Sequence, residues 1–261
     1  MKSWSSYIIN LDRAPERWEH MEKMFVEGGI SHVRVSAIDG NQLAFPCADF
    51  DEKKFRRFHG RDINIYEVAC YLSHLKAIKL FLESDDEFAM ICEDDLFLKQ
   101  GCKEVVETAL NSSSLWNILR LTGLREGKAC QIQQLTAHCF LTLHLSRLKG
   151  AGAYLIDRKA ASVLVKELIP MWLPWDHAID REWIFGLRAL AVAPFPISQT
   201  DEKFESAIQK MSQPKLSSHQ RCLTTYPYQV LNEFSRWMAR GFYFLKLILC
   251  TLFSTRKPEG K

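Results

Sequence analysis

An apolar run that ends in three carboxylates constrains the fold of this chain more than any other feature. Residues 88–92 have the sequence Phe-Ala-Met-Ile-Cys, and Glu93, Asp94 and Asp95 follow at once. A short, continuous apolar run of this kind indicates a buried strand. In open α/β sheets, ligands bind beyond the carboxyl ends of the strands. The run therefore predicts a buried strand that delivers three acids to a ligand-binding edge.

The N-terminal part of the chain has the order strand, helix, strand. Residues 6–11 are mostly apolar, Asp12 follows as an expected helix N-cap, and Pro15 suits the first helical turn. Residues 33–37 indicate a second strand, which a turn at residues 39–40 closes. This order is typical of a parallel sheet covered by helices.

The rest of the chain continues the alternation of helices and strands. We expect helices over 65–82, 101–110, 157–168 and 176–187, strands over 115–121, 131–145, 152–156 and 190–193, and a mobile loop over 198–223. The predicted class is α/β, with a mostly parallel sheet flanked by helices. We expect one such domain over residues 1–230 and a separate C-terminal tail over 231–261.

Composition narrows the class of protein. The chain has 47% hydrophobic and 25% charged residues, which excludes disorder for most of its length. A net charge of +3 argues against a nucleic-acid binder. The eight cysteines form no C-x-x-C pair, so we expect buried thiols rather than a disulfide framework or a zinc site. The first ten residues lack the apolar core of a signal peptide, and we expect a cytoplasmic protein.

The three acids suggest a metal site. Adjacent carboxylates at a buried strand end repel one another, and a divalent cation relieves that repulsion. Mg²⁺ and Mn²⁺ prefer carboxylate oxygens and keep coordination positions open for substrate phosphates. The alternative is an exposed acidic turn. The preceding apolar run favours the metal, because it places the acids at the end of a buried strand.

Basic residues near the same edge fit a diphosphate. Arg13 and Arg17 lie just after the first strand and one helical turn apart. Their guanidinium groups match phosphate oxygens in geometry and charge. The alternative for Arg17 is the solvated face of a helix.

Two further groups of polar residues are candidates for the site. Ser73, His74 and Lys76 interrupt or border the apolar helix over 65–82, where a polar pair inside a helix interface is the alternative. Asp176 and Asp180 share a helical face after a proline break. Such a carboxylate is a candidate general base for an acceptor hydroxyl. The alternative is an N-cap at Asp176 and a surface acid at Asp180.

The C-terminal tail has a character of its own. Residues 242–253 are almost wholly apolar, and this stretch is too short to span a bilayer. Basic residues surround it, namely Arg236, Arg240, Lys246, Arg256 and Lys257. A basic amphipathic helix of this kind lies in a membrane interface, which is our expectation here. The alternative is a helix packed on the core or on another subunit.

The motifs, taken in order, resemble those of glycosyltransferase family 25, which includes lipooligosaccharide and lipopolysaccharide (LPS) biosynthesis enzymes. The resemblance runs from about residue 5 to about residue 200 and weakens over the C-terminal third. The matching segments are 7–13, 15–17, 35–40, 67–76, 90–95, 152–156 with 160–161, and 174–176. Two residues depart from the family pattern: Tyr66 replaces a common glycine and Trp175 a common valine. Neither change removes a polar group, so we expect activity to be retained.

The resemblance implies a GT-A-like nucleotide-binding fold, a UDP-galactose donor, a divalent metal (Mn²⁺ or Mg²⁺) and inversion at the anomeric carbon. It places Glu93 to Asp95 at the metal and the diphosphate, and Asp176 near the reacting groups. The motifs do not assign a catalytic base. We take Asp176 as the first candidate for the catalytic base and Glu93 and Asp95 as the metal ligands. The predicted donor-binding residues are Asn10, Arg13, Arg17, Asp39, Ser73, His74, Lys76 and Asp94. The expected acceptor is a lipid-linked core glycan of lipooligosaccharide or LPS. The expected location is the cytoplasmic face of the inner membrane of a bacterium.

Two other functions remain open at this stage. One is a binding or scaffold protein with a transferase-like fold that has lost catalysis. The intact acidic motif argues against it. The other is a metal-dependent phosphohydrolase, which ranks last because the sequence lacks an obvious His/Asp cluster for two metals.

Overall fold

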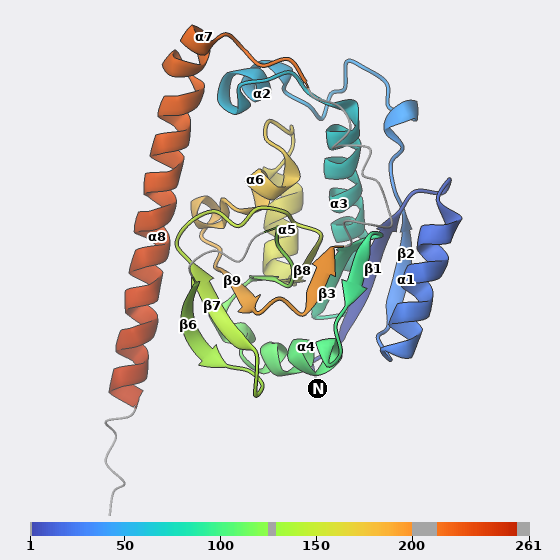
Figure 1. The fold of residues 1–261 in the computed structure, drawn as a ribbon, viewed down its shortest axis with the longest axis vertical. Coiled ribbons are helices and arrows are strands. Elements are labelled where there is room, and N and C mark those ends of the chain that lie inside the picture. Colours follow the sequence, from blue (N-terminus) through green and yellow to red (C-terminus); the bar gives the residue numbers. More distant parts are fainter. Residues whose placement is uncertain (1, 125–128, 200–212, 255–261) are drawn as a thin grey trace, which may run out of the picture.

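The computed structural model describes residues 2–124, 129–199 and 213–254 (Figure 1). The strands in these ranges are β1 (Trp4–Asn10), β2 (His32–Ser36), β3 (Phe88–Glu93), β4 (Leu96–Leu98), β5 (Ile118–Arg120), β6 (Ala129–Gln134), β7 (Phe140–His144), β8 (Ala153–Asp157), β9 (Ala189–Ala193) and β10 (Ile197–Gln199). The α-helices are α1 (Pro15–Glu27), α2 (Glu52–His59), α3 (Ile65–Glu83), α4 (Cys102–Asn111), α5 (Arg158–Glu167), α6 (Trp175–Ile179), α7 (Ser218–Leu223) and α8 (Thr225–Ser254). Short 3₁₀ turns are η1 (Gly40–Gln42), η2 (Ser113–Leu115) and η3 (Glu182–Phe185).

Eight strands form one mixed sheet in the order β2-β1-β3-β8-β5-β9-β7-β6. Strands β1, β2 and β3 pair in parallel, and so do β5 and β9. Strand β8 runs antiparallel between β3 and β5, and β7 runs antiparallel to both β9 and β6. Within this sheet, every strand except β8 and β7 therefore points the same way. This agrees with the predicted α/β class, and it places the carboxyl ends of β1 and β3 side by side.

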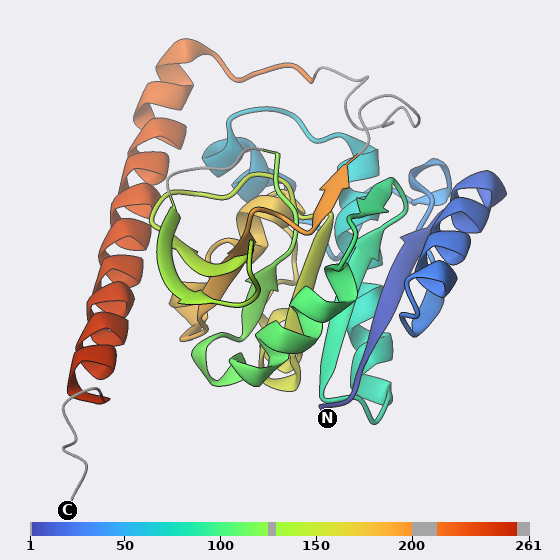
Figure 2. The same ribbon diagram turned by 60° about the horizontal axis from the view of Figure 1, so that its bottom comes forward.

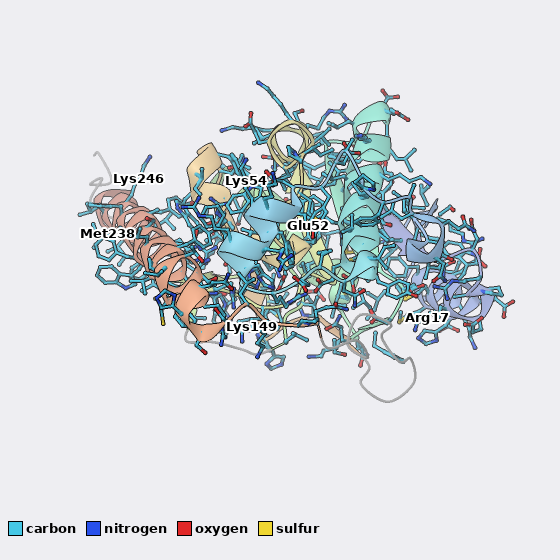
Figure 3. All side chains as sticks on the ribbon, turned by 90° about the horizontal axis from the view of Figure 1, so that it is seen from above. Arg17, Glu52, Lys54, Lys149, Met238 and Lys246 are labelled. Atoms are coloured by element: carbon cyan, nitrogen blue, oxygen red, sulfur yellow. The ribbon has the colours of Figure 1, made fainter. Side chains whose placement is uncertain are left out.

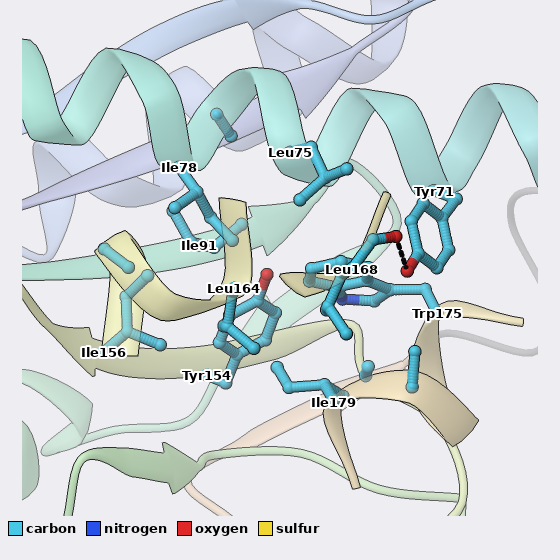
Figure 4. Close-up of a cluster of buried hydrophobic side chains, with 14 of the residues drawn as sticks. Tyr71, Leu75, Ile78, Ile91, Tyr154, Ile156, Leu164, Leu168, Trp175 and Ile179 are labelled. Atoms are coloured by element: carbon cyan, nitrogen blue, oxygen red, sulfur yellow. Dashed lines mark hydrogen bonds between the residues drawn. The ribbon is translucent and has the colours of Figure 1, made fainter. Parts of the chain in front are cut away.

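Helices cover both faces of the sheet (Figures 1 and 2). Alternate residues of a strand point to opposite faces. In β1, Ile9 thus belongs to the cluster that contains α3, α5 and α6, whereas Ile8 belongs to the cluster that contains α1 and α4. In the first cluster, Leu75 of α3 packs among strand and α5 side chains such as Ile91 and Leu164 (Figure 4). Both faces of the central strands are buried, which explains their continuous apolar runs.

Helix α3 begins and ends as its sequence predicts. The Asn64 side chain caps it by accepting a hydrogen bond from the backbone N–H of Tyr66, and the helix ends at Glu83 before Ser84. Such a cap satisfies one of the free N–H groups of the first turn. Because α3 packs against the sheet, the polar residues Ser73 and His74 are carried inside the molecule.

The predicted N-cap of α1 is wrong. The N-cap residue is Ala14, and no side chain caps this helix end. Asp12 instead accepts a 2.6 Å hydrogen bond from the hydroxyl of Ser36 and forms an ion pair with Arg34. The acid therefore ties the end of β1 to the end of β2, next to the predicted ligand edge.

The predicted helix over 176–187 is also wrong, because the chain forms α6 and then η3 with a break at Asp180 and Arg181. Asp180 turns inward at this break. Its carboxylate lies 2.9 Å from Nη2 of Arg240 and 3.1 Å from Nε of Arg236. Asp180 is buried, so it is neither a surface acid nor a candidate base.

The segment expected to be a loop contains regular structure at both ends. Residues 197–199 form β10, which pairs with β4, and residues 218–223 form α7 with a capping box between Ser217 and Gln220. Residues 200–212 lie outside the described part of the chain.

The structure describes seven cysteines, and all of them are free thiols. Cys92 and Cys102 are buried as expected, whereas Cys222 is exposed.

Helix α8 lies along one flank of the molecule, on the opposite side from Arg17 of α1 (Figures 1 and 3). The predicted division between residues 230 and 231 falls inside this helix. Arg240 fixes the helix to the body, because it makes five hydrogen bonds: three to the carboxylates of Asp180 and Glu182, and two to the carbonyls of His144 and Ser146. None of the described helices combines the length and the hydropathy that a membrane span requires.

Candidate active site

A pocket of about 300 Å³ lies at the carboxyl ends of β1 and β3. Its walls come from the start of α1, the segment between β2 and η1, one face of α3 and the acidic segment after β3. A second hollow, lined by residues 36–39 and 42–43 among others, adjoins it and shares Leu11 and Arg13 with it. The structure thus brings the predicted acids and arginines to one edge of the sheet, where ligands of α/β proteins bind.

Asp94 lies at the centre of a buried hydrogen-bond network. Asn10 of β1 donates to one of its carboxylate oxygens at 2.7 Å, and Arg17 of α1 donates to the other at 3.1 Å. Arg34 in turn donates to the side-chain carbonyl of Asn10 at 2.7 Å. Burial raises the pKa of Asp94, whereas the bonds from Asn10 and Arg17 act in the opposite direction. Both oxygens of Asp94 are therefore already bonded to protein groups.

Asp95 and Glu93 are the other two acids of the motif, and Asp95 lines the pocket together with Asp94. Burial, and after it the negative charges of Glu93 and Asp94, raises the pKa of Asp95 to about 7. Glu93 is partly exposed and lines the same pocket. A divalent cation offsets this kind of crowding between carboxylates. The donor set of Glu93 and Asp95 thus fits Mg²⁺ or Mn²⁺.

His74 lies beneath the pocket rather than in it. Its ring is fully buried and stacks on Trp175 at a centroid distance of 4.8 Å and an interplanar angle of 8°. One ring nitrogen is 3.1 Å from the Tyr154 hydroxyl, and the other is 3.3 Å from Oε1 of Glu93. His74 is therefore in contact with Glu93, which lines the pocket, while its own side chain does not line it.

Ser73 and Lys76 support the wall of the pocket. The Ser73 hydroxyl donates to the carbonyl of Ala69 at 2.7 Å and accepts from the backbone N–H of Ile38 at 2.8 Å. The ammonium group of Lys76 donates to the carbonyl of Ser36 at 2.7 Å. Both side chains thus hold the segment after β2 against α3, and of the two only Ser73 lines the pocket.

Arg13 and Asp39 form an ion pair at the border between the two hollows. Nε of Arg13 donates to Asp39 at 2.8 Å, and the backbone N–H of Asn41 donates to the same carboxylate at 2.9 Å. These two bonds, that from Arg13 first, lower the pKa of Asp39. Half of the Arg13 side chain is exposed, so its guanidinium group is accessible from the pocket.

The two departures from the family pattern both place aromatic rings at the site. Trp175 stacks on His74, as described above. Tyr66 lines the pocket and donates its hydroxyl to the side chain of Asn41 at 2.8 Å. Its ring lies so close to Gly40 that a Cβ there would stand 2.5 Å from it. The glycine at position 40 is therefore required by the tyrosine at position 66.

Asp176 lies at the start of α6, outside the lining of the 300 Å³ pocket. Its carboxylate accepts a 3.3 Å hydrogen bond from the backbone N–H of Gly150. The negative charges of Asp176, Glu93 and Asp95 all act on the thiol of Cys70, which is on α3. Burial is the main reason that the pKa of Cys70 is raised, and these charges raise it further.

Sequence reasoning missed a cluster formed by Cys70, His74 and Glu93. One ligand atom from each residue lies within 4.8 Å of the other two. The spacing of Cys70 and His74, one helical turn apart on α3, is the signal that could have revealed it. A second missed contact is the ion pair of Arg61 with Glu67, in which Nη1 and Nη2 of the guanidinium group donate to the two carboxylate oxygens at 2.9 and 2.6 Å.

An α/β sheet with an acidic, arginine-lined pocket at its carboxyl edge is the architecture of a ligand-binding α/β protein. Residues 4–179 match the sequence profile of a protein family described as glycosyltransferase family 25 (LPS biosynthesis protein). The chain belongs to glycosyltransferase family 25. Membership of this family agrees with the GT-A-like fold that the sequence predicts.

Three relatives illustrate the relationship. The chain is 28% identical over 219 residues to a glycosyltransferase 25 family member of Drosophila melanogaster, covering 75% of this chain and 36% of the relative. It is 24% identical over 249 residues to a Haemophilus influenzae protein named "Putative glycosyltransferase", covering 91% and 86%. It is 25% identical over 224 residues to procollagen galactosyltransferase 1-B of Xenopus laevis, covering 76% and 36%. The chain thus spans about a third of the length of the insect and frog relatives.

Proposed function

We propose that this protein is a metal-dependent glycosyltransferase that transfers galactose from UDP-galactose, with inversion, to the core glycan of lipooligosaccharide or LPS. The observation that carries the proposal is the pocket at the ends of β1 and β3, where two arginines and the acids of the motif face one space. A nucleoside diphosphate needs both charges there, because its phosphates bind arginine and a cation, and the cation binds carboxylates.

The arginines are the proposed contacts of the diphosphate. Arg13 is half exposed and lines both hollows, and Arg17 is held in place by its 3.1 Å contact with Asp94. Guanidinium groups that are fixed by a carboxylate lose little conformational freedom when they bind phosphate. Tyr66 supplies an aromatic ring to the same pocket, which suits contact with a nucleobase.

Glu93 and Asp95 are the proposed metal ligands, and Asp94 supports them through its bonds to Asn10 and Arg17. A bound Mn²⁺ or Mg²⁺ neutralises charge on the diphosphate leaving group. His74 positions Glu93 through the contact between its ring nitrogen and Oε1. The stacking of the His74 ring on Trp175 and the contact of its other nitrogen with the Tyr154 hydroxyl keep this contact in one geometry.

Asp176 is the proposed general base. It takes the proton from an acceptor hydroxyl while the oxygen of that hydroxyl attacks the anomeric carbon of the donor. The bond between this carbon and the diphosphate oxygen breaks on the opposite face, so the configuration inverts. The hydrogen bond from the backbone of Gly150 holds the carboxylate in position for this step. Holding donor and acceptor in register supplies much of the rate.

The sugar and the acceptor rest on the relatives. A relative named procollagen galactosyltransferase supports galactose as the donor sugar. The description of the matching family as LPS biosynthesis proteins supports a lipooligosaccharide or LPS acceptor. Specificity between hexoses depends on a few hydroxyl contacts, so a screen of UDP-sugars is the step that follows nucleotide binding.

The test is calorimetric titration of the protein with UDP, with and without Mn²⁺, and with CMP and GDP as controls. We expect tight binding of UDP only when the metal is present, and weak binding of the other two nucleotides. A folded sample that binds no nucleotide under either condition would contradict the proposal. That result would favour the alternative function, a scaffold protein with a transferase-like fold.

A further inference from the structure

Helix α8 has two faces of opposite character. The inner face carries Arg236 and Arg240, both buried in ion pairs, and Tyr243, whose hydroxyl bonds to the carbonyl of Leu115. These contacts fix the rotation of the helix about its own axis. The residues on the other side therefore face away from the body, as Figure 3 shows for Met238 at the outer edge of the molecule.

The outer face is a continuous apolar stripe, which we call the α8 seam. Eight of its large side chains are between 38% and 67% exposed: Val230, Leu231, Phe234, Trp237, Phe242, Leu245, Ile248 and Leu249. A large side chain has on the order of 200 Å² of surface, so a little over half exposure of eight gives roughly 900 Å². The largest apolar patch of a monomeric protein is about 300–600 Å². A stable dimer buries about 800 Å² on each partner.

The spacing of the seam is that of a helix-pairing surface. Residues 231, 234, 238, 241, 245 and 248 follow one another at alternating intervals of three and four, which is the a/d pattern of a coiled coil. Gly241 stands in this series, and a Cβ there would meet no atom of the described chain within 4 Å. The glycine leaves a notch at the middle of the seam, where a second helix can approach closely.

The seam is also self-complementary when a copy of it is reversed. In an antiparallel pair of helices, a positions of one helix lie against d positions of the other, and here each such layer joins two positions without charge. The layers pair Leu231 with Ile248, Phe234 with Leu245, and Met238 with Gly241. Because a twofold axis relates the two helices, each pairing occurs twice, once in each direction. A contact in which residue i meets j and j meets i is the signature of a twofold dimer.

The charge on α8 favours a protein partner over a lipid surface. Among the described side chains from residue 226 to residue 249, the exposed charges are Glu233 and Lys246, which cancel. Arg236 and Arg240 belong to the basic cluster that the sequence linked to a membrane, and both are occupied by Asp180 and Glu182. Interfacial helices bind anionic lipid through a basic polar face. The described part of α8 has no such face.

We propose that the α8 seam is a dimer interface, at which α8 pairs antiparallel with α8 of a second copy of this chain. The interface is on the opposite flank from Arg17 (Figure 3), so its formation should not require the donor or the metal. Its chemistry is apolar, and its strength should change little with salt.

The test uses sedimentation equilibrium of the full chain at micromolar concentration without detergent. We expect a dimer for the wild type. The variants Phe234→Glu and Leu245→Lys each place a charge in the same layer and should weaken dimerisation at least tenfold. The double variant should recover the dimer, because Glu at 234 of one copy then faces Lys at 245 of the other. These positions are eleven residues apart on one helix, so they cannot pair within a single copy.

Val26→Glu on α1 is the matched control, since Val26 is 65% exposed and lies outside the seam. It should sediment as the wild type does. Circular dichroism of each variant should be unchanged, because every substitution is at a solvent-exposed position. A wild type that is monomeric at tens of micromolar would overturn the proposal. Flotation of that monomer with phosphatidylglycerol vesicles would assign the seam to a membrane. Failure of the double variant to recover the dimer would overturn the antiparallel pairing.

Discussion

Asn10 and Asp94 are joined by a 2.7 Å hydrogen bond between the ends of two neighbouring strands. The two residues are 84 positions apart in the sequence, and both are buried. The bond fixes the carboxylate at the centre of the acidic motif and, through Arg17, the first turn of α1. Asn10, Asp94 and Arg17 are therefore connected in one network at the pocket beyond β1 and β3.

The first prediction concerns this bond. Asn10→Ala removes a donor to Asp94 and the acceptor for Arg34, and it leaves polar groups of both unsatisfied. We expect a loss of about 1–3 kcal/mol in the free energy of unfolding, measured by urea denaturation. The affinity for UDP with Mn²⁺ should fall as well. A loss of stability without any change in the affinity for UDP would show that Asn10 supports the fold and not nucleotide binding.

The second prediction concerns the metal. Asp95→Asn removes one charge from a buried cluster of acids, so the fold should be retained while the cation loses a ligand. We expect transfer activity to become undetectable and the effect of Mn²⁺ on UDP binding to disappear. Glu16→Gln is a suitable control, since Glu16 lines the same pocket outside the acidic motif. Wild-type turnover in the Asp95 variant would rule out the metal assignment.

The third prediction concerns the base. Asn at position 176 retains an oxygen that accepts the hydrogen bond from Gly150 but cannot take a proton. We expect Asp176→Asn to lower kcat by about 10²–10⁴. KM for the donor should stay within a few-fold of the wild type, because the residue lies outside the donor pocket. A fall in donor affinity with kcat preserved would instead indicate a role in donor binding.

The fourth prediction concerns the attachment of α8. Arg240→Met leaves the carboxylates of Asp180 and Glu182 buried with fewer partners. Breaking a buried ion pair on one side costs about 3–5 kcal/mol, and we expect a loss of that size in urea unfolding. Lys246→Met on the exposed side of the same helix should change stability by less than about 0.5 kcal/mol. Equal effects of the two variants would contradict the structural role of Arg240.

The fifth prediction concerns pH. His59 and His177 pack edge to face at 5.0 Å, and burial is the main reason that the pKa of each is lowered to about 3. Below pH 6.5 the unfolded chain binds protons at these positions and the folded chain does not. The stability that these two histidines contribute is therefore fully present above pH 6.5, and it is lost as the pH drops from 6.5 towards 3. Each histidine contributes up to about 1.4 kcal/mol per pH unit in that window.

The measurement is the free energy of unfolding of the wild type and of His59→Gln between pH 7.5 and 4.5. The raised pKa of Asp95 acts in the opposite direction below pH 7 in both proteins, so the difference between the two curves isolates the histidine. The variant should lose less stability than the wild type as the pH falls. Parallel curves would show that the pKa of His59 is not lowered in the folded state.

The sequence by itself determined the local elements and the position of the acids. The apolar run of β3 and the capped pattern of α3 are decided by neighbouring residues, so β3 and α3 have the bounds that the sequence predicts to within about one residue. It also placed Arg13, Arg17 and Glu93 to Asp95 at one edge of a sheet, because successive strands and helices of an α/β fold return to that edge.

Only the tertiary structure decided which polar groups pair with one another. His74 is buried against Glu93, and Asp180 pairs with Arg236 and Arg240. Two basic residues of the tail are buried, while most of its large apolar side chains are exposed. These partners are up to 60 residues apart along the chain. Their pairing depends on the path of the backbone between them and on the cost of burying an unpaired charge, and neither is encoded in a local pattern.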